Sequence, residues 1–216
     1  MNPYRALHRL ALSCLELCRR ASRLREARRV LARMPQPYRL HIGCDRVHLD
    51  GWLNIDRRNV PGHVDMVWDA TQRFPMPDAS CSLIYNEHFL EHLYPEQAMS
   101  FLRECHRLLR PGGILRTAMP SLEYLVAKYM DPVHWKEQAW LSKPSYQHIK
   151  TRAEMLNAAF RWWGHRWLYD REELHRRLQD AGFEAVCDVE RGVSVERDLC
   201  NRETREDSLL LCEALR

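Results

Sequence analysis

The chain has 216 residues, of which 45% are hydrophobic and 29% are charged, and its formal net charge is +4. This composition is ordinary for a globular protein, and the length suits one α/β domain with an added element. No apolar run approaches the roughly 20 residues that cross a bilayer, so we expect no membrane-spanning helix.

The first predicted element is a basic amphipathic helix within residues 1–36. Residues 1–34 contain nine arginines and two glutamates, and apolar residues recur every three or four positions from Leu7 to Leu31. Pro35 and Pro37 end the pattern. The helix could pack on its own domain, form a homodimer seam or contact a membrane surface. An organelle transit segment fits the same composition.

Charge argues against nucleic acid as a partner. The arm carries +7 and the whole chain +4, so the remaining residues carry −3 (+4 minus +7). A mildly acidic body lacks the basic face that nucleic-acid binding requires.

Residues 37–216 alternate between short apolar runs and helical patterns. Helices are predicted in "PEQAMSFLRECHRLLR" and "DREELHRRLQDAGF", each with a proline or glycine at an end. Strands are predicted in "YRLHIGC", "GWLNID", "VDMVWDA", "CSLIYNEH", "ILRTAMP", "EAVCDVE" and "SLLLCEAL". This alternation predicts an α/β fold with a doubly wound, mostly parallel sheet of seven strands and helices on both faces. Such sheets bind ligands at the carboxyl ends of their strands.

A tryptophan-rich segment, residues 121–165, interrupts the alternation and has no clear strand pattern. We expect it to be an insertion that lies over the strand ends as a lid. Its tryptophans belong either to a core or to a surface that stacks on a sugar or an aromatic ring.

The eight cysteines are scattered, and none forms a CxxC pair. A chain of this size needs no disulfide framework, so we expect reduced thiols and a cytoplasmic location.

The stretch "HIGCDRVHLDGWLNID" combines a strand, a glycine turn and a second strand that ends in an acid. Gly43 allows a sharp turn, and Asp56 is placed to accept hydrogen bonds from two ribose hydroxyls. Both features suit a cofactor that contains adenosine. A lone glycine after a strand is also typical of an ordinary turn.

Two longer segments narrow the interpretation. "WDATQRFPMPDASCSLIYNEHFLEHL" and "FLRECHRLLRPGGILRTAMPSLEYL", with the later "WGHRWLYDREELHRRLQDAGF", resemble class I S-adenosylmethionine-dependent methyltransferases of the type 11-like branch. The resemblance covers roughly two thirds of the chain. It implies a Rossmann-like methyltransferase fold and S-adenosyl-L-methionine as cofactor.

The resemblance also implies roles for single residues. Gly43, Cys44 and Asp45 face the methionine part of the cofactor, Asp56 binds the ribose, and Asp69 with Ala70 binds the adenine edge. Asn86 and Glu87 line the cleft near the reacting methyl group. Asp45 stands where family members usually have a second glycine, and it either crowds the cofactor or binds its amino group.

The stretch "EHFLEH", residues 87–92, contains the inverted zinc-peptidase pattern His88-x-x-Glu91-His92. That motif needs a helix long enough to fix both histidines, whereas this one follows a strand directly and runs into Tyr94-Pro95. The resembling family has a similar stretch in the same place with no metal implied. We therefore expect no metal, a structural role for Glu91 and His92, and a position for His88 nearer the cleft.

The acceptor side is predicted to use histidine. His88 and His165, in "RWWGHRWLYD", are the candidate catalytic bases, since histidine accepts protons near neutral pH. The alternative for His165 is a buried residue that ties the insertion to the sheet. The predicted reaction is methylation of a small-molecule or saccharide hydroxyl. N-methylation of a peptide or amine, and a non-catalytic adaptor that kept the fold, are the alternatives.

Overall fold

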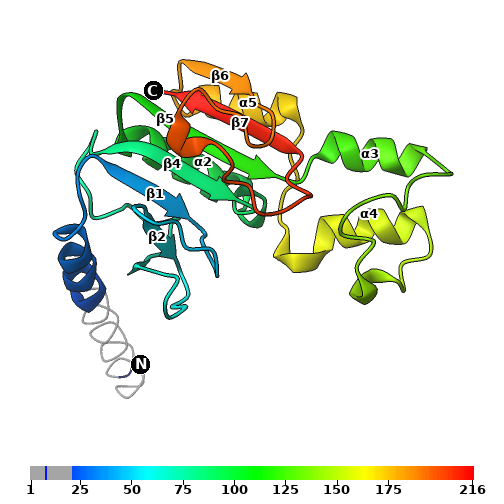
Figure 1. The fold of residues 1–216 in the computed structure, drawn as a ribbon, viewed down its shortest axis with the longest axis horizontal. Coiled ribbons are helices and arrows are strands. Elements are labelled where there is room, and N and C mark those ends of the chain that lie inside the picture. The colour runs from blue at the N-terminus through cyan, green and yellow to red at the C-terminus, as the bar shows by residue number, and fades with distance from the viewer. Residues whose placement is uncertain (1–7, 9–20) are drawn as a thin grey trace, which may run out of the picture.

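A computed structural model describes residue 8 and residues 21–216 (Figure 1). Its centre is a seven-stranded sheet with the order β3-β2-β1-β4-β5-β7-β6. β7 is antiparallel to β5 and β6, and the pairs among β1 to β5 are parallel. The strands are β1 (Tyr38–Ile42), β2 (Leu53–Asp56), β3 (Met66–Val67), β4 (Cys81–Glu87), β5 (Leu109–Met119), β6 (Ala185–Asp188) and β7 (Leu210–Leu215). The predicted mostly parallel sheet of seven strands is confirmed.

Alternation along β4 divides the core between the two faces of the sheet, because successive side chains of a strand point to opposite faces. Ile84 belongs to the larger hydrophobic cluster. Leu83 and Tyr85 belong to a smaller cluster with Trp52 and Leu199. Glu87 continues the series of Leu83 and Tyr85, so its carboxylate points to the face of the smaller cluster.

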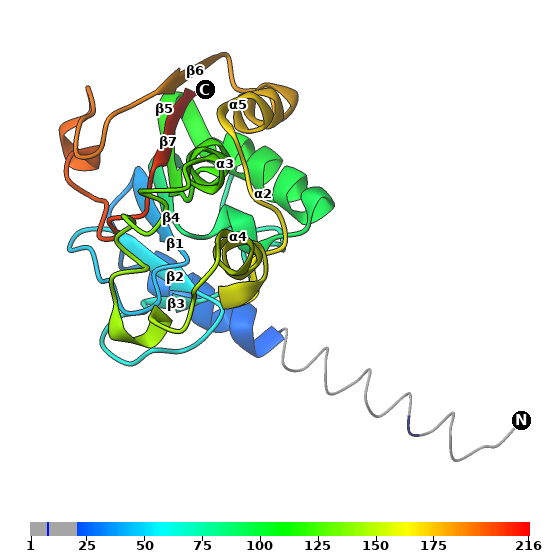
Figure 2. The ribbon, with the colours of Figure 1, turned by 90° about the vertical axis from the view of Figure 1, so that its right-hand side faces the viewer.

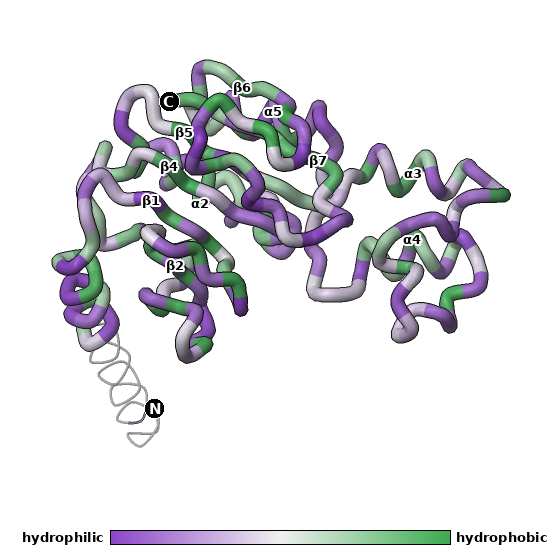
Figure 3. The backbone as a smooth tube through the Cα atoms, viewed as in Figure 1, coloured by the Kyte–Doolittle hydropathy of each residue, from purple (hydrophilic) through white to green (hydrophobic). Residues whose placement is uncertain are grey.

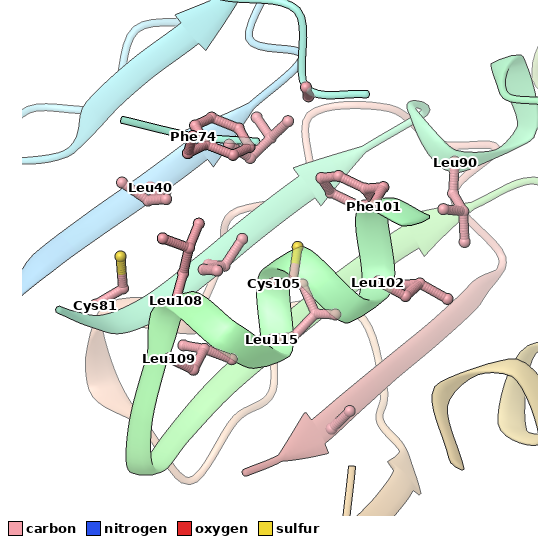
Figure 4. Close-up of a cluster of buried hydrophobic side chains, with 14 of the residues drawn as sticks. Leu40, Phe74, Cys81, Leu90, Phe101, Leu102, Cys105, Leu108, Leu109 and Leu115 are labelled. Atoms are coloured by element: carbon pink, nitrogen blue, oxygen red, sulfur yellow. The ribbon is translucent and has the colours of Figure 1, made fainter. Parts of the chain in front are cut away.

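The larger cluster lies between the sheet and the helices α2 (Pro95–Leu108) and α5 (Arg171–Asp180). Figure 4 shows side chains of α2 directed toward β1, β4 and β5. Residues 21–31 are also helical, and Ala27 and Leu31 are buried in the same cluster. This part of the predicted N-terminal helix therefore packs on its own domain, and residues 32–36 after it are not helical. Residues 1–7 and 9–20 of the prediction lie outside the described residues.

The opposite face is covered differently from the sequence-based expectation of helices on both faces. Its cover comes from Trp52 and from the segment between β6 and β7, which contains the short 3-10 helix η4 (Arg197–Leu199) (Figure 2). The connection from β1 to β2 is a series of turns with no helix. The shortness of this connection, residues 43–52, explains why no helix covers the sheet there.

The insertion at residues 121–165 contains α3 (Leu122–Met130), η2 (Pro144–Tyr146), α4 (Arg152–Arg161) and η3 (Trp162–Gly164). It has a hydrophobic cluster of its own, in which Trp135 and Trp140 are buried. α3 and α4 lie side by side beyond the carboxyl ends of β4 and β5 (Figures 1 and 2). Hydrophilic and hydrophobic residues alternate along both helices (Figure 3), as expected for helices with one buried face.

Within the described part of the chain, no helix is long and apolar enough to cross a membrane.

Candidate active site

The main cavity of the described structure has a volume of about 720 Å³ and lies between the sheet and the insertion. The carboxyl ends of parallel strands, where α/β folds bind ligands, form its floor. Asp45 comes from the loop after β1, His88 follows β4, and His165 closes the insertion. Its other polar and aromatic lining residues include Arg58, Tyr124, Lys143, Tyr146, Trp163, Arg205, Glu206 and Asp207.

The stretch "EHFLEH" turns sharply as it leaves the sheet. β4 ends at Glu87, and His88 has a φ of +50°, a left-handed conformation that is uncommon for residues other than glycine. A single 3-10 turn, η1 (Leu90–His92), follows. The expected absence of a long helix here is confirmed, so His88 and His92 do not have the geometry of a helical zinc-peptidase motif.

Glu87 is bound by the chain between β6 and β7. Its carboxylate accepts hydrogen bonds from the backbone N–H groups of Thr204 and Arg205 at 3.0 Å, and from the hydroxyls of Thr204 and Ser208 at 2.6 Å. Burial raises the pKa of this carboxyl, but these hydrogen bonds together hold the pKa below its ordinary value. Glu87 therefore anchors a loop of the cavity wall as a carboxylate.

Glu91 has the opposite environment four residues later. Its side chain is fully buried, and within the described residues neither carboxylate oxygen has a hydrogen-bond partner. Burial raises its pKa to about 8. Three histidines lie close to it. Nδ1 of His88 is 3.4 Å from Oε1, and one ligand atom each of His92 and His165 lies within 4.8 Å of a carboxylate oxygen. The rings of His92 and His165 stand edge to face with centroids 5.0 Å apart.

These three histidines are held neutral. Burial lowers the pKa of His88 and of His92 to about 4, and burial also lowers the pKa of His165. This pKa of His88 lies below the near-neutral value that the sequence analysis expected of a catalytic base. A neutral imidazole can accept a proton or bind a metal ion through its free nitrogen.

The loop after β1 is fastened to the end of β2. The N–H groups of Gly43 and Cys44 donate to the carbonyl of Ile55 at 2.8 and 3.2 Å, and the N–H of Asp45 donates to Oδ2 of Asp56 at 3.1 Å. Gly43 has a φ of +72°, and a Cβ there would lie 2.8 Å from the ring of Phe89. Glycine is therefore required at this position by both backbone conformation and space.

Asp56 lies at the end of β2, as predicted, beside an ion pair between Arg58 and Asp45. Its Oδ1 accepts the N–H of Arg58 at 2.8 Å, and the guanidinium of Arg58 binds Asp45 at 2.9 Å. The Arg58 side chain is 66% exposed, so it can move away from the carboxylates. Each carboxylate oxygen of Asp56 keeps one lone pair for a further donor.

The remaining predicted cofactor residues lie at the ends of β3 and β4. Oδ1 of Asp69 accepts from the N–H and the hydroxyl of Thr71, next to the buried Ala70. The Asn86 side chain is fully buried, with Oδ1 bound by the hydroxyl of Thr117. Within the described residues its Nδ2 has no partner.

Among the ten predicted site residues, the cavity brings together Asp45, His88 and His165. The other seven (Gly43, Cys44, Asp56, Asp69, Ala70, Asn86 and Glu87) are not among the described lining residues, because Phe89, Arg58 and the 204–208 loop lie over several of them. Sequence analysis missed Arg205, Glu206 and Asp207, which line the same cavity. Their only signal is the run of charges in "NRETRED".

Comparison with known proteins agrees with this architecture. Residues 43–117 match a family model described as a methyltransferase domain. A probable S-adenosylmethionine-dependent methyltransferase of Mycolicibacterium smegmatis is 40% identical over 58 residues, which are 27% of this chain and 22% of that protein. One of the same description from Mycobacterium tuberculosis is 38% identical over 58 residues, 27% of this chain and 20% of its own.

The chain thus spans about a fifth of the length of the curated relatives it matches. A crystal structure described as a SAM-dependent methyltransferase from Archaeoglobus fulgidus superimposes with a TM-score of 0.50 and 18% identity. It covers 92% of this chain and 94% of its own. At this identity the likeness concerns the fold.

Proposed function

We propose that the chain, whose residues 43–117 match a methyltransferase domain, is a class I S-adenosylmethionine-dependent methyltransferase. It transfers a methyl group from S-adenosylmethionine to a hydroxyl of a small molecule or saccharide. The observation that carries the proposal is the cavity at the strand ends, where Asp45 and His88 face the insertion. Open α/β sheets bind their ligands at the carboxyl ends of their strands.

The predicted cofactor residues fit such a ligand. Asp56 keeps free lone pairs for the two ribose hydroxyls once Arg58 moves aside, and the buried Nδ2 of Asn86, unpartnered among the described residues, is a donor at the end of β4. Asp69 and Ala70 follow β3 and would meet the adenine edge. Asp45 would bind the amino group of the methionine moiety. When bound, S-adenosylmethionine supplies an electrophilic methyl group.

The acceptor would be activated by histidine. His88 is neutral and lines the cavity, so its imidazole can take the proton of an acceptor hydroxyl. His165 faces the same space from the insertion and is the second candidate base. The remaining task of the protein is to position the acceptor oxygen in line with the methyl carbon and to exclude water.

The aromatic wall of the cavity supports a saccharide acceptor. Trp140 and Trp163 pack at right angles with ring centroids 5.3 Å apart, and Nε1 of Trp163 donates to the hydroxyl of Tyr146 at 3.0 Å. Trp163 is 45% exposed, so a ring face remains for a sugar to stack on. The insertion would then act as the lid.

One observation favours a second function, that of a non-catalytic adaptor with the same fold. The ion pair between Asp45 and Arg58 stands where the cofactor would lie. If this pair is permanent, the cofactor cannot enter, and the fold serves another purpose.

Cofactor binding and product analysis test the proposal. Calorimetry with S-adenosylhomocysteine should give micromolar affinity, whereas an absence of binding by the folded protein favours the adaptor. Labelled S-adenosylmethionine should then transfer label to saccharides in a panel of hydroxyl and amine acceptors. Label found only on amines would replace O-methylation by N-methylation.

We also propose that the protein acts in the reducing environment of the cytoplasm. The six cysteines in the described part of the chain carry free thiols, and four of them are buried. Free thiols persist in reducing compartments.

A further inference from the structure

We propose that Glu91, His92 and His165 bind one divalent transition-metal ion at the inner wall of the cavity. One ligand atom from each residue lies within 4.8 Å of the other two. A tetrahedral zinc ion with bonds of about 2.1 Å sets its ligand atoms about 3.4 Å apart. To close this set around an ion, the ligand atoms need to approach one another by at most about 1.4 Å (4.8 minus 3.4).

The carboxylate of Glu91 is the strongest indication of a missing ligand. It has no exposed surface, and both of its oxygens lack a hydrogen-bond partner within the described residues. Buried polar atoms are satisfied in almost all proteins, and an exception calls for an explanation such as a bound ion. A cation between Glu91 and the two histidines would satisfy the carboxylate.

Both histidines face the cluster with a nitrogen that is free to bind. Nδ1 of His165 lies 2.7 Å from the carbonyl oxygen of Ala159. Since a carbonyl only accepts, Nδ1 carries the proton, and Nε2 keeps its lone pair. Nδ1 of His92 lies beside Gly164, 3.7 Å from the place that a Cβ of that glycine would occupy. Histidine ligands of metals are commonly oriented in this way by a backbone carbonyl on the other nitrogen.

The backbone holds the three ligands together. The N–H groups of Arg166 and Trp167 donate to the carbonyl of Glu91 at 2.8 and 3.2 Å. These bonds fix the chain that carries His165 beside the 3-10 turn that carries Glu91 and His92. Backbone hydrogen bonds thus position the cluster, as a preformed site requires.

The donor set indicates the kind of ion. Two imidazoles and one carboxylate suit zinc and neighbouring transition metals, whereas calcium and magnesium prefer oxygen ligands. Catalytic zinc sites use three protein ligands and leave the fourth position open. Here His92 and His165 both line the cavity, so the open position would face the acceptor.

This ligand set differs from the motif visible in the sequence. The inverted zinc-peptidase pattern would use His88 and His92, but the third member of the cluster is His165, from the end of the insertion. The inference also replaces the expectation of no metal. His88 remains beside the cluster as the base, and His165 becomes a ligand.

The role of the ion rests on the proposed function, although its binding does not. An acceptor hydroxyl in the open position would be polarised by the ion and would give up its proton more readily to His88. Its oxygen then forms the bond to the methyl carbon as the carbon–sulfur bond of the donor breaks.

A second group of residues supplies a matched control. His175, Asp188 and Cys212 also lie within reach of a common ion. There, however, Nε2 of His175 binds Asp188 directly at 2.8 Å, and Arg171 binds the same carboxylate. Because Asp188 is already satisfied by these partners, we expect no ion in this second group.

Metal titration of the full chain tests the inference. The protein is stripped with a chelator and titrated with zinc by calorimetry and with cobalt by absorption spectroscopy. We expect one ion per chain, a tetrahedral cobalt spectrum and a melting temperature that rises with zinc, because a ligand of the native state stabilises it. Glu91→Gln and His165→Ala should each weaken binding on the order of 100-fold, since even supporting residues contribute 10- to 100-fold. His175→Ala should bind like the wild type.

Several outcomes would overturn the inference. One is no binding by the folded wild type; another is equal binding by the wild type and a folded Glu91→Gln variant. Loss of binding in His175→Ala alone would move the ion to the second group. A parallel titration with S-adenosylhomocysteine separates the two proposals. Cofactor binding without metal binding removes only the metal site, and metal binding without cofactor binding removes only the methyltransferase function.

Discussion

The stretch "EHFLEH" contains the sequence pairs Glu87-His88 and Glu91-His92, and the carboxylates of the two pairs lie in opposite environments. The carboxylate of Glu87 accepts hydrogen bonds from Thr204, Arg205 and Ser208. Four residues later, the carboxylate of Glu91 is buried without a hydrogen-bond partner among the described residues. The pKa is lowered for Glu87 and raised for Glu91.

The difference in hydrogen bonding indicates that Glu87 has a structural role, whereas the carboxylate of Glu91 is available to bind a ligand. Glu87 is satisfied, so its removal should damage the fold of the cavity wall. The Glu91 side chain accepts no hydrogen bond within the described residues, so the native state gains little from its carboxylate. Neighbouring positions with the same residue types therefore have different functions, and each can be tested separately.

The largest expected effect concerns the histidine of the first pair. If His88 is the base for a hydroxyl, His88→Ala should lower turnover by on the order of 10²–10⁴. Affinity for S-adenosylhomocysteine should change little, because His88 faces the acceptor. Steady-state kinetics and calorimetry measure the two quantities, with His175→Ala as the control. Near-normal turnover of the variant would leave positioning alone to explain catalysis.

The next effect compares the two glutamates by stability. Glu87→Ala should lower the free energy of unfolding by about 3 kcal/mol, since it leaves two N–H groups and two hydroxyls without their acceptor. Glu91→Gln should change it by less than about 1 kcal/mol in metal-free protein, because no hydrogen bond in the described structure is lost. Urea unfolding at pH 7 measures both. Equal losses would show that the contrast between the two pairs is not energetic.

His41 lies outside the stretch "EHFLEH" and shows the effect of burial alone on the pKa of a histidine. Burial lowers the pKa of His41 from 6.5 to about 4, although Asn54 is hydrogen-bonded to it. As pH falls, His41 is protonated in the unfolded chain near pH 6.5 but in the folded chain only near pH 4. The free energy of unfolding is therefore highest above pH 6.5 and decreases as pH falls toward 4. The loss should reach about 3 kcal/mol, at 1.36 kcal/mol for each pH unit. Unfolding free energies of the wild type and His41→Gln between pH 7 and 4 measure it, and parallel curves would contradict the assignment.

The smallest expected effect is on cofactor affinity and concerns Asp56. Like Glu87, Asp56 has a carboxylate that accepts backbone hydrogen bonds. Asp56→Ala should lose about 1.5–3 kcal/mol of affinity for S-adenosylhomocysteine, the range for hydrogen bonds to a charged group. Asp50→Ala is the control, because the Asp50 side chain is exposed and lies in the same connection. Unchanged affinity in a folded Asp56→Ala variant would place the ribose elsewhere.

The sequence by itself determined the strands of the sheet, and it indicated that ligands bind at the carboxyl ends of those strands. All seven predicted strands are present, because short apolar runs are typical of strands that are buried on both faces of a mostly parallel sheet. The helices at 95–108 and 171–180 follow in the same way from apolar spacing and from proline and glycine at their ends. The prediction was less accurate where signals are local and weak. Pro111 and the two glycines after it lie within β5, and α3 and α4 were not predicted.

Only the tertiary structure decided which polar groups meet. Glu87 finds its partners 117 positions away, and His165 reaches Glu91 because the backbone of Arg166 and Trp167 binds the 3-10 turn. Periodicity states that a residue is buried but not beside which distant residue it lies, since that depends on the path of the loops between them. The sequence could therefore place Glu87-His88 and Glu91-His92 at the end of β4. Only the fold brought Thr204, Arg205 and Ser208 to Glu87. Only the fold brought His165 to Glu91 and His92, as the third ligand of the proposed metal site.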